Sequence, residues 1–417
     1  MINTVSIYGL GYIGLPTAAV LASNGVNVIG VDINQEVVDT INSGKIHIEE
    51  PFLEDIVNDV VDSGYLNATT KPEEADAFLI AVPTPFIESS SADDPKPDLT
   101  YIKSACENIS TVLKKEDIVI IESTSPVGTT EKVQDWLSNL RKDLTFPNTH
   151  GEKSDIRIAY CPERVLPGQV IKELVSNDRL IGGITEKCSK TAMKVYKRFV
   201  KGDCVSTDSK TAEMAKLTEN AYRDVNIAFA NELSIISENL NINVWELIKL
   251  SNLHPRVNIL NPGPGVGGHC IAVDPWFIVS KTPDDAQLIR TARQVNDSKP
   301  MKIINKVDRI ISKDPNAKIS IFGLTYKPNI DDLRESPALF IAQEITRKSH
   351  IKLKIVEPNI NKLPEGLDKR HELVDSETAL IDAEYIIILV PHTQFFETFR
   401  SYKLTGKILD FCGLLET

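Results

Sequence analysis

One cysteine ends the most unusual stretch of the chain. Residues 261–270 read NPGPGVGGHC, with four glycines and two prolines ahead of Cys270. Such a turn fixes the backbone and exposes N–H groups. A thiolate held there can add to an aldehyde, and loss of hydride from the thiohemiacetal gives a thioester that water hydrolyses. Cys270, with Asp274 close behind, is predicted to be a nucleophile; the alternative is a small buried residue, the usual fate of free cysteine.

A second group of residues suits a dinucleotide. The run GLGYIG at 9–14 follows an apolar strand and opens a helix, and Asp32 closes the next strand 18 residues after Gly14. Gly9 permits the tight turn, Gly11 lets backbone N–H groups approach a pyrophosphate, and Gly14 allows close helix packing. Asp32 would accept hydrogen bonds from ribose hydroxyls and repel a 2′-phosphate, which favours NAD over NADP. A glycine turn that serves only packing is the alternative.

Polar residues recur along one predicted helix. Lys216, Asn220 and Arg223 have the spacing i, i+4, i+7, which places them on one face. A lysine and an amide together can hold an oxyanion, although a solvated helix face is the alternative interpretation. Other stretches whose cations could meet phosphate, each of which could also be a plain surface charge, contain Arg164, His254, Arg256, Tyr326, Lys327 and Arg334.

The elements that must position these residues alternate between strands and helices. Buried strands are predicted at 5–8, 26–31, 77–82, 118–121, 156–160, 319–322, 353–356, 385–390 and 407–411. The alternation predicts α/β architecture with parallel, doubly wound sheets. The opening VSIYGL resembles ISIFGL at 319–324, so the C-terminal half is expected to be a second nucleotide-binding-type domain.

A long helix is predicted over 211–240, as a spine between domains. The expected domains are 1–205 for NAD, 206–300 for the helical core with the cysteine turn, and 301–417 for the second nucleotide-binding-type domain, which the resemblance described below assigns to a UDP-sugar. The segment 83–98, with its prolines and serines, is expected to be a surface loop, as a plain connection or a lid.

Composition excludes several classes. The formal charge is −12 over 417 residues, which disfavours nucleic-acid and anionic-membrane binding. No apolar run approaches the roughly 18 residues of a membrane span, and no signal peptide is evident. The six cysteines form no CxxC pair, so neither a metal site nor a disulfide framework is expected, and a reduced cytoplasmic enzyme is predicted.

Several separated motifs resemble those of the nucleotide-sugar 6-dehydrogenase family, which contains UDP-glucose dehydrogenase, and together they span nearly the whole chain. They are GLGYIGLP at 9–16, VPTP at 82–85, STSPVGTT at 123–130, CPERVLPG at 161–168, AKLTEN at 215–220, GVGGHC at 265–270 and FGLTYKPNIDDLRESP at 322–337. The run 254–277 is most similar to the branch acting on UDP-N-acetyl-D-mannosamine. His269 stands where UDP-glucose dehydrogenases typically have Ser or Thr, which points to N-acetylated sugars.

The resemblance implies two Rossmann-like domains joined by a long central helix and a helical dimerisation core. It implies oxidation of the sugar C6 alcohol to a carboxylate with two NAD per turnover, through an aldehyde, a thiohemiacetal and a thioester on Cys270. It also implies a homodimer in which Arg256 reaches the neighbouring subunit's site, and a uronate product used for surface polysaccharide.

The resemblance also assigns roles to single residues. The implied catalytic residues are Cys270 as nucleophile, Lys216 and Asn220 for the oxyanion, Asp274 and Glu163 for water, and Thr124 beside the nicotinamide. The implied NAD contacts are Gly9, Gly11, Tyr12, Ile13, Gly14, Asp32, Thr84, Thr124 and Arg334. The implied UDP-sugar contacts are Arg164, Val165, Lys216, Asn220, Arg223, His254, Arg256, Gly267, Tyr326 and Lys327.

Three other functions stay open. The same chemistry could act on UDP-glucose or on UDP-N-acetyl-glucosamine or -galactosamine. A hydroxyacid or 6-phosphogluconate-type dehydrogenase would share the glycine cradle but give one NADH per substrate. A non-catalytic nucleotide-sugar-binding regulator would be expected to lack Cys270 or Lys216, and both are present.

Overall fold

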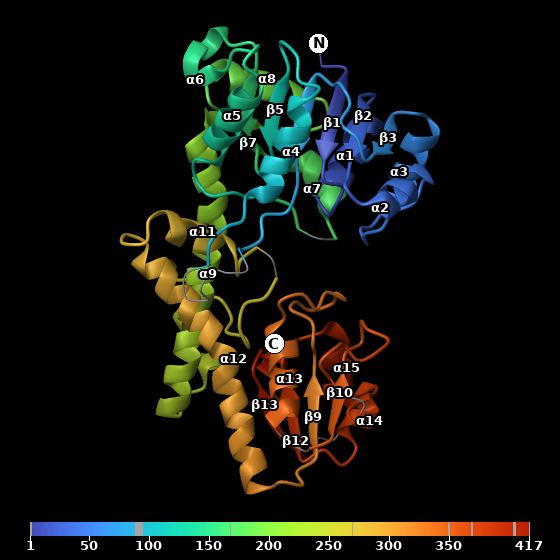
Figure 1. The fold of residues 1–417 in the computed structure, drawn as a ribbon. Coiled ribbons are helices and arrows are strands. Elements are labelled where there is room, and N and C mark those ends of the chain that lie inside the picture. The colour runs from blue at the N-terminus through green and yellow to red at the C-terminus, as the bar shows by residue number, and fades with distance from the viewer. Residues whose placement is uncertain are drawn as a thin grey trace. The chain divides into compact units, whose positions relative to one another are not determined.

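The chain forms two compact units in the computed structural model, which describes residues 2–87, 95–166, 168–268, 270–348, 351–367, 370–402 and 406–416 (Figure 1). The first unit holds residues 1–218 and 280–282, and the second holds 219–279 and 283–417. Helix α9 (Ser209–Leu240) belongs to both, because the division falls after Thr218.

The first unit is built on an eight-stranded sheet with the order β3-β2-β1-β4-β5-β6-β7-β8. Its strands are β1 (Thr4–Tyr8), β2 (Asn27–Val31), β3 (Leu66–Thr69), β4 (Ala77–Ile80), β5 (Ile118–Ile121), β6 (Arg157–Tyr160), β7 (Arg179–Gly183) and β8 (Cys204–Asp208). Its helices are α1 (Gly14–Ser23), α2 (Gln35–Asn42), α3 (Leu53–Asp62), α4 (Thr100–Ser110), α5 (Thr129–Leu140), α6 (Pro147–His150), η1 (Gly151–Lys153), α7 (Val170–Ser176) and α8 (Glu186–Tyr196).

The sheet departs from the expected parallel order at one junction. β7 pairs antiparallel with β6, and β8 then runs parallel to β7. The described part of the chain between β6 and β7 contains the seven-residue α7. The sequence pattern did not indicate β8 because its residues are mostly exposed and polar, so no apolar run marks it.

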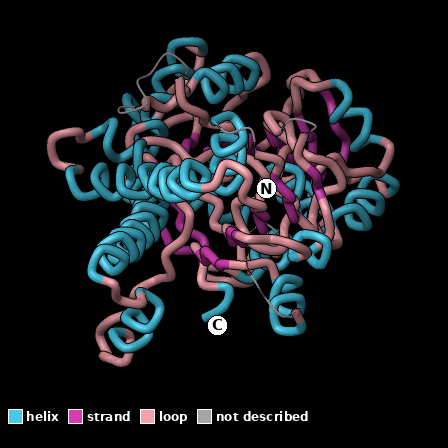
Figure 2. The backbone as a smooth tube through the Cα atoms, turned by 90° about the horizontal axis from the view of Figure 1, so that it is seen from below, coloured by secondary structure: helices cyan, strands magenta, loops and turns pink. Residues whose placement is uncertain are grey.

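Helices cover both faces of this sheet. Alternate residues of β1 and β4 enter two separate cores: Val5 and Leu79 pack with α1, whereas Tyr8 and Phe78 pack with α4. In Figure 2 the strands are drawn magenta and the helices cyan. This three-layer arrangement confirms the α/β fold predicted from the alternating pattern.

The second unit carries a five-stranded parallel sheet with the order β11-β10-β9-β12-β13. Its strands are β9 (Ile319–Phe322), β10 (Leu353–Val356), β11 (Glu372–Leu373), β12 (Tyr385–Ile388) and β13 (Lys407–Asp410). Its helices, besides α9, are α10 (Val244–Ser251), α11 (Asp274–Lys281), α12 (Gln287–Lys313), α13 (Pro337–Lys348), α14 (Ser376–Leu380), α15 (Thr393–Ser401) and η2 (Leu414–Glu416). The last residues of α11 are grouped with the first unit.

The two sheets repeat one local geometry. The Gly9 N–H donates to the Val31 carbonyl at 2.8 Å, and the Gly323 N–H donates to the Val356 carbonyl at 2.8 Å. Both glycines have left-handed backbone, with φ of +89° and +91°. The similarity between the two openings of the sequence is therefore also a similarity of backbone structure.

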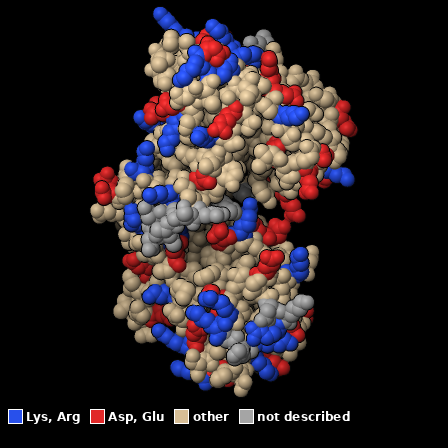
Figure 3. All heavy atoms as spheres, in the orientation of Figure 1, with Lys and Arg blue, Asp and Glu red and all other residues tan. Residues whose placement is uncertain are grey.

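Two surface properties complete the description. Within the ranges that the structure describes, no helix is both long and apolar enough to cross a bilayer. On the face drawn in Figure 3, acidic and basic side chains are interspersed rather than gathered by sign.

Candidate active site

The carboxyl ends of β1, β4 and β5 gather the predicted cofactor residues of the first unit. The 9–14 turn follows β1, Thr84 follows β4, and Thr124 follows β5. The Thr84 hydroxyl donates to the Thr124 carbonyl at 2.6 Å, which joins two of these loops directly. In a doubly wound sheet this edge is where ligands bind.

The glycine turn has the geometry that a dinucleotide requires. A Cβ built on Gly14 would lie 1.8 Å from the Gly9 carbonyl oxygen, so α1 packs too closely on the turn for any side chain. A Cβ on Gly11 would meet no atom within 4 Å, which leaves open space above that backbone. Helix α1 begins without a side-chain cap, so its first N–H groups and its dipole suit a phosphate.

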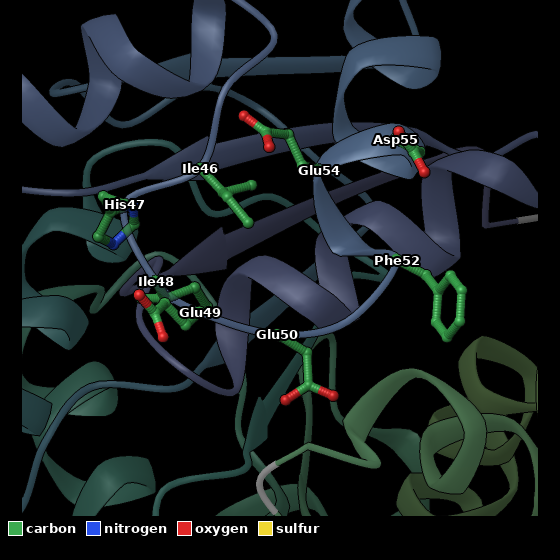
Figure 4. Close-up of a pocket in the computed structure, with 8 residues that line it drawn as sticks. All are labelled: Ile46, His47, Ile48, Glu49, Glu50, Phe52, Glu54 and Asp55. Carbon is green, nitrogen blue, oxygen red and sulfur yellow. The ribbon is translucent and has the colours of Figure 1, made fainter. Parts of the chain in front are cut away.

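Asp32 is oriented by the turn that it faces. One carboxylate oxygen accepts from the Leu10 N–H at 2.9 Å and the other from the Asn34 N–H at 3.0 Å. A hollow of about 640 Å³ is lined by residues 46–50 and by Phe52, Glu54 and Asp55, which belong to the segment that links α2 to α3 and to the first turn of α3 (Figure 4). Burial lowers the pKa of His47 in this hollow, while the nearby Asp32 carboxylate acts in the opposite direction. The hollow contains none of the predicted site residues.

Glu163 is held as the partner of a buried arginine. Its carboxylate accepts from the Arg179 guanidinium at 2.5 Å and from the Arg164 N–H at 2.7 Å. Both side chains of the ion pair are almost inaccessible. Both Glu163 oxygens are therefore engaged, which suits an ionised structural carboxylate better than a free general base. The Arg164 guanidinium itself donates to the Asp178 carbonyl.

A second carboxyl shares this interior. Glu122 follows β5 and accepts from the Tyr196 hydroxyl at 2.7 Å. Burial raises the pKa of Glu122 to about 7, while the Arg179 charge acts in the opposite direction. One guanidinium thus faces two carboxyls, and the deeper one tends toward its neutral form.

Lys216 is buried on the part of α9 that lies in the first unit. One turn earlier, Glu213 is fully buried and accepts from the backbone N–H groups of Gly128 and Thr130 at 2.6 and 2.7 Å. Glu213 therefore fastens this stretch of α9 to the start of α5. The solvated-face alternative for Lys216 does not fit its burial.

Cys270 lies in the second unit, four residues before Asp274 at the start of α11, and it is exposed. Its carbonyl accepts from the N–H groups of Val273 and Asp274, so the backbone turns directly from the cysteine into the helix. The alternative interpretation, a small buried residue, does not fit an exposed side chain; Cys106, Cys161 and Cys188 are the buried thiols.

Asn220 and Asp274 meet in the same unit. The Asn220 amide donates to the Asp274 carboxylate at 2.6 Å, and both side chains are buried. The contact joins α9 to the first residue of α11, four positions after Cys270. Two of the predicted catalytic residues are thereby brought together.

The cysteine turn also contacts the predicted sugar-nucleotide loop. A Cβ on Gly267 would lie 2.5 Å from the Glu335 carbonyl oxygen and 2.7 Å from Tyr326 Cβ. A Cβ on Gly268 would lie 3.0 Å from the Tyr326 ring. The glycines are needed because Tyr326 packs against the backbone, so the turn and this loop form one surface.

The other predicted residues take varied places. Arg223 and Lys327 are exposed. His254 and Arg256 are exposed on a loop that Asn252 closes by two hydrogen bonds to Ile259.

Arg334, predicted to contact NAD, forms an ion pair with Asp332 at 2.6 Å. His269 lies outside the described residues, as do 88–94 of the expected surface loop. The base of that loop is closed by hydrogen bonds from the Ile87 and Asp98 N–H groups.

Sequence reasoning missed the buried partners of these residues, namely Arg179, Glu213 and a polar group around Asp224 and Arg293. A signal existed for the last: Asn220, Asp224 and Asn231 continue one helix face at spacings of four and seven.

Comparison with known proteins identifies one family along nearly the whole chain. The UDP-glucose/GDP-mannose dehydrogenase family matches with its NAD-binding domain at residues 3–200, its central domain at 210–298 and its UDP-binding domain at 320–416. An NDP-N-acetyl-D-galactosaminuronic acid dehydrogenase of Ralstonia nicotianae is 59% identical over 94% of this chain and 92% of its own. A UDP-N-acetyl-D-mannosamine dehydrogenase of Campylobacter jejuni is 57% identical over 98% of this chain and 99% of its own.

A solved structure is similar as well. The UDP-N-acetyl-mannosamine dehydrogenase Cap5O from S. aureus has a TM-score of 0.86 and 42% identity, and covers 99% of this chain and 96% of its own. The predicted NAD-binding N-terminal fold and UDP-binding C-terminal fold are confirmed. The chain belongs to the UDP-glucose/GDP-mannose dehydrogenase family.

Proposed function

We propose that this chain oxidises the C6 alcohol of UDP-N-acetyl-D-mannosamine to the carboxylate of UDP-N-acetyl-D-mannosaminuronate, with two NAD per turnover. The observation that carries the proposal is an exposed Cys270 in a glycine turn, next to the buried Asn220–Asp274 pair, in a chain of this family. An ordinary alcohol dehydrogenase needs no such thiol, because its reaction stops at the carbonyl.

The balanced chemistry explains the need for the thiol. NAD, when bound, accepts a hydride from C6, once from the alcohol and once from the cysteine adduct, with release of one proton each time. Between these events the Cys270 sulfur bonds to the aldehyde carbon and forms a thiohemiacetal. The second oxidation leaves a thioester, and water adds to its carbonyl, breaks the C–S bond and returns the thiol, with the carboxylate as product.

Nearby side chains support these steps. Lys216 and the Asn220 amide are proposed to stabilise negative charge on the C6 oxygen. Asp274 is proposed to position the hydrolytic water, because it lies four residues from Cys270 and is held by Asn220. Glu163 is less suited to that task, since Arg179 and the Arg164 N–H occupy its oxygens.

The cofactor cradle is proposed to hold NAD through the residues at the sheet edge. The 9–14 turn would take the pyrophosphate, Asp32 the ribose hydroxyls, and Thr84 and Thr124 the nicotinamide side. The support is the open space over Gly11, the uncapped α1 and the orientation of the Asp32 carboxylate. The UDP-sugar would meet Arg164, Val165, Arg223, Gly267, Tyr326 and Lys327.

The same chemistry on an N-acetyl-galactosamine nucleotide is the second candidate. It is favoured by the Ralstonia relative, whose identity of 59% is close to the 57% of the mannosamine enzyme. The test is a panel of UDP-sugars assayed for NADH and for uronate product, with Cys270→Ser beside the wild type. We expect the highest kcat/KM with UDP-N-acetylmannosamine and no uronate from the variant; uronate formation by the variant at the wild-type rate would refute the proposal.

We further propose a homodimer in which Arg256 completes the neighbouring subunit's site, working in a reducing cytoplasm that keeps Cys270 as a thiol. The support is an exposed apolar stripe on α9, in which Tyr222, Phe229 and Ile236 recur every seven residues. Mixing Cys270→Ala with Arg256→Ala chains tests the arrangement. We expect each variant to be inactive alone and the mixed dimer to regain activity, whereas a mixture as inactive as its parts would contradict it.

A further inference from the structure

A group of buried polar side chains lies behind the cysteine turn, between α9 and α12. Asp224 and Asn231 of α9 face Arg293 and Asn296 of α12, and all four are completely buried. The Arg293 guanidinium contacts the Asp224 carboxylate at 2.5 Å and also pairs with the half-exposed Asp297 at 2.8 Å. None of these residues has a part in the chemistry proposed above.

The hydrogen bonds in this group have a fixed direction. The Asn296 amide N–H donates to the Asp224 carboxylate at 2.7 Å, so the Asn296 oxygen must face the other way. That oxygen accepts from the Asn231 amide at 2.8 Å, which turns the Asn231 oxygen outward. An ionised carboxylate only accepts, so Asp224 sets the orientation of both amides. Burial raises the pKa of Asp224 to about 6, which leaves it ionised at pH 8.

Hydrogen bonds from this polar group reach the backbone on both sides of the cysteine turn. The outward oxygen of Asn231 accepts from the Gly263 N–H at 2.9 Å, where the turn begins. The Arg293 guanidinium donates to the Ile271 carbonyl at 3.3 Å, one residue after Cys270. Between these two points the turn packs against proline side chains: a Cβ on Gly265 would lie 3.0 Å from Pro337 and 3.2 Å from Pro300.

We propose that Asn231 and Arg293 are positioning residues for Cys270, which hold the two ends of its turn so that the sulfur meets the aldehyde carbon. Replacement of a buried ion pair by apolar side chains is often neutral or stabilising, so stability alone does not account for this group. Misplacement of a reacting atom by about 1 Å can slow a reaction about a hundredfold. The inference rests on the proposed function, since it concerns the step in which Cys270 captures the aldehyde.

The test compares Asn231→Ala with Asn231→Asp and with Ser237→Ala at pH 8. Asn231→Ala removes the acceptor for the Gly263 N–H, whereas Asn231→Asp keeps it. Ser237 is a matched control, because it is buried on the same helix and its hydroxyl makes no hydrogen bond within the described residues. The readouts are NADH released per UDP-N-acetylmannosamine consumed, aldehyde trapped by a hydrazine, kcat and KM.

For Asn231→Ala we expect NADH per sugar to fall from two toward one, trapped aldehyde to appear, and kcat for the uronate to fall about a hundredfold with KM nearly unchanged. Asn231→Asp should restore part of the ratio, and Ser237→Ala should match the wild type. Partial unfolding lowers the amount of active enzyme but leaves this ratio unchanged. A ratio of two and no aldehyde for Asn231→Ala would overturn the inference, while a wild type that yields only one NADH would overturn the proposed function instead.

A second variant, and a measurement that needs no turnover, keep the inference testable if Asn231→Ala folds poorly. Arg293→Lys keeps a cation beside Asp224 but loses the planar fork that reaches Ile271. We expect it to change the rate of Cys270 alkylation by iodoacetamide at least threefold, measured on the Cys270 peptide, with Ser237→Ala unchanged. Alkylation at the wild-type rate in both Arg293→Lys and Asn231→Ala would also overturn the inference.

Discussion

Alanine substitutions at two glycines of the cofactor turn should separate effects on folding stability from effects on NAD binding. In Gly14→Ala the new Cβ would lie 1.8 Å from the Gly9 carbonyl oxygen, and this distance must open to at least 3.0 Å. Both groups belong to rigid backbone, so α1 has to move away from the turn, at a cost of about 1–3 kcal/mol in the free energy of unfolding. The displaced helix N-terminus should also lose the cofactor.

Gly11→Ala should behave differently. Its Cβ meets no atom within 4 Å in the protein alone, so the free energy of unfolding should change by less than about 0.5 kcal/mol. The methyl group would occupy the space over the backbone where a pyrophosphate must approach. Loss of one hydrogen bond to a charged group, about 2 kcal/mol, corresponds to about thirtyfold weaker NAD binding.

The assay pairs urea unfolding without ligand with calorimetric titration of NAD. Gly25→Ala is the control, because this glycine has φ of +74° and open space around it but follows the far end of α1. It should lose about 1 kcal/mol of stability and bind NAD normally. Wild-type NAD affinity in Gly11→Ala would refute the assignment of this turn to the pyrophosphate.

Three further predictions test other parts of the site. Asp32→Ser should raise the ratio of kcat/KM for NADP to that for NAD at least tenfold, because it removes the charge that repels a 2′-phosphate; an unchanged ratio would count against Asp32 as the selecting residue. Because burial raises the pKa of folded Glu122 from 4.5 to about 7, its contribution to stability is present below pH 4.5 and lost as the pH rises to 7. Between pH 4.5 and 8 the wild type should therefore lose about 3 kcal/mol relative to Glu122→Gln in urea unfolding, and parallel profiles would contradict this. Asp274→Asn should lower kcat about a hundredfold with little change in KM, as expected if it positions water; a change in KM alone would assign it to substrate binding.

The sequence predicted those parts of the fold that local patterns encode. The strands at 118–121, 319–322 and 353–356 were placed at their observed bounds because each is a short segment made mostly of β-branched and other apolar residues. The long helix was expected at 211–240 and spans Ser209–Leu240. The exposed β8 and the antiparallel pairing of β7 were not predicted, since neither apolar periodicity nor a turn motif marks them.

The candidate site likewise contains residues that the sequence predicted and residues that it did not. Motif residues such as Cys270 and Asp32 could be chosen from the spacing of nearby glycines, because positions where other atoms approach the backbone closely require glycine. The partners that hold them were not. Arg179 lies 16 residues beyond Glu163, and Arg293 lies 69 residues beyond Asp224. Such ion pairs depend on which helices and strands the tertiary fold brings together, and a single sequence does not encode that in any local pattern.

The most direct test of the account counts NADH released per UDP-N-acetylmannosamine consumed by the purified wild-type protein, with the uronate identified as product. The mechanism on Cys270 predicts two NADH for each sugar and no free aldehyde. A single NADH for each sugar, with the aldehyde as final product, would contradict it.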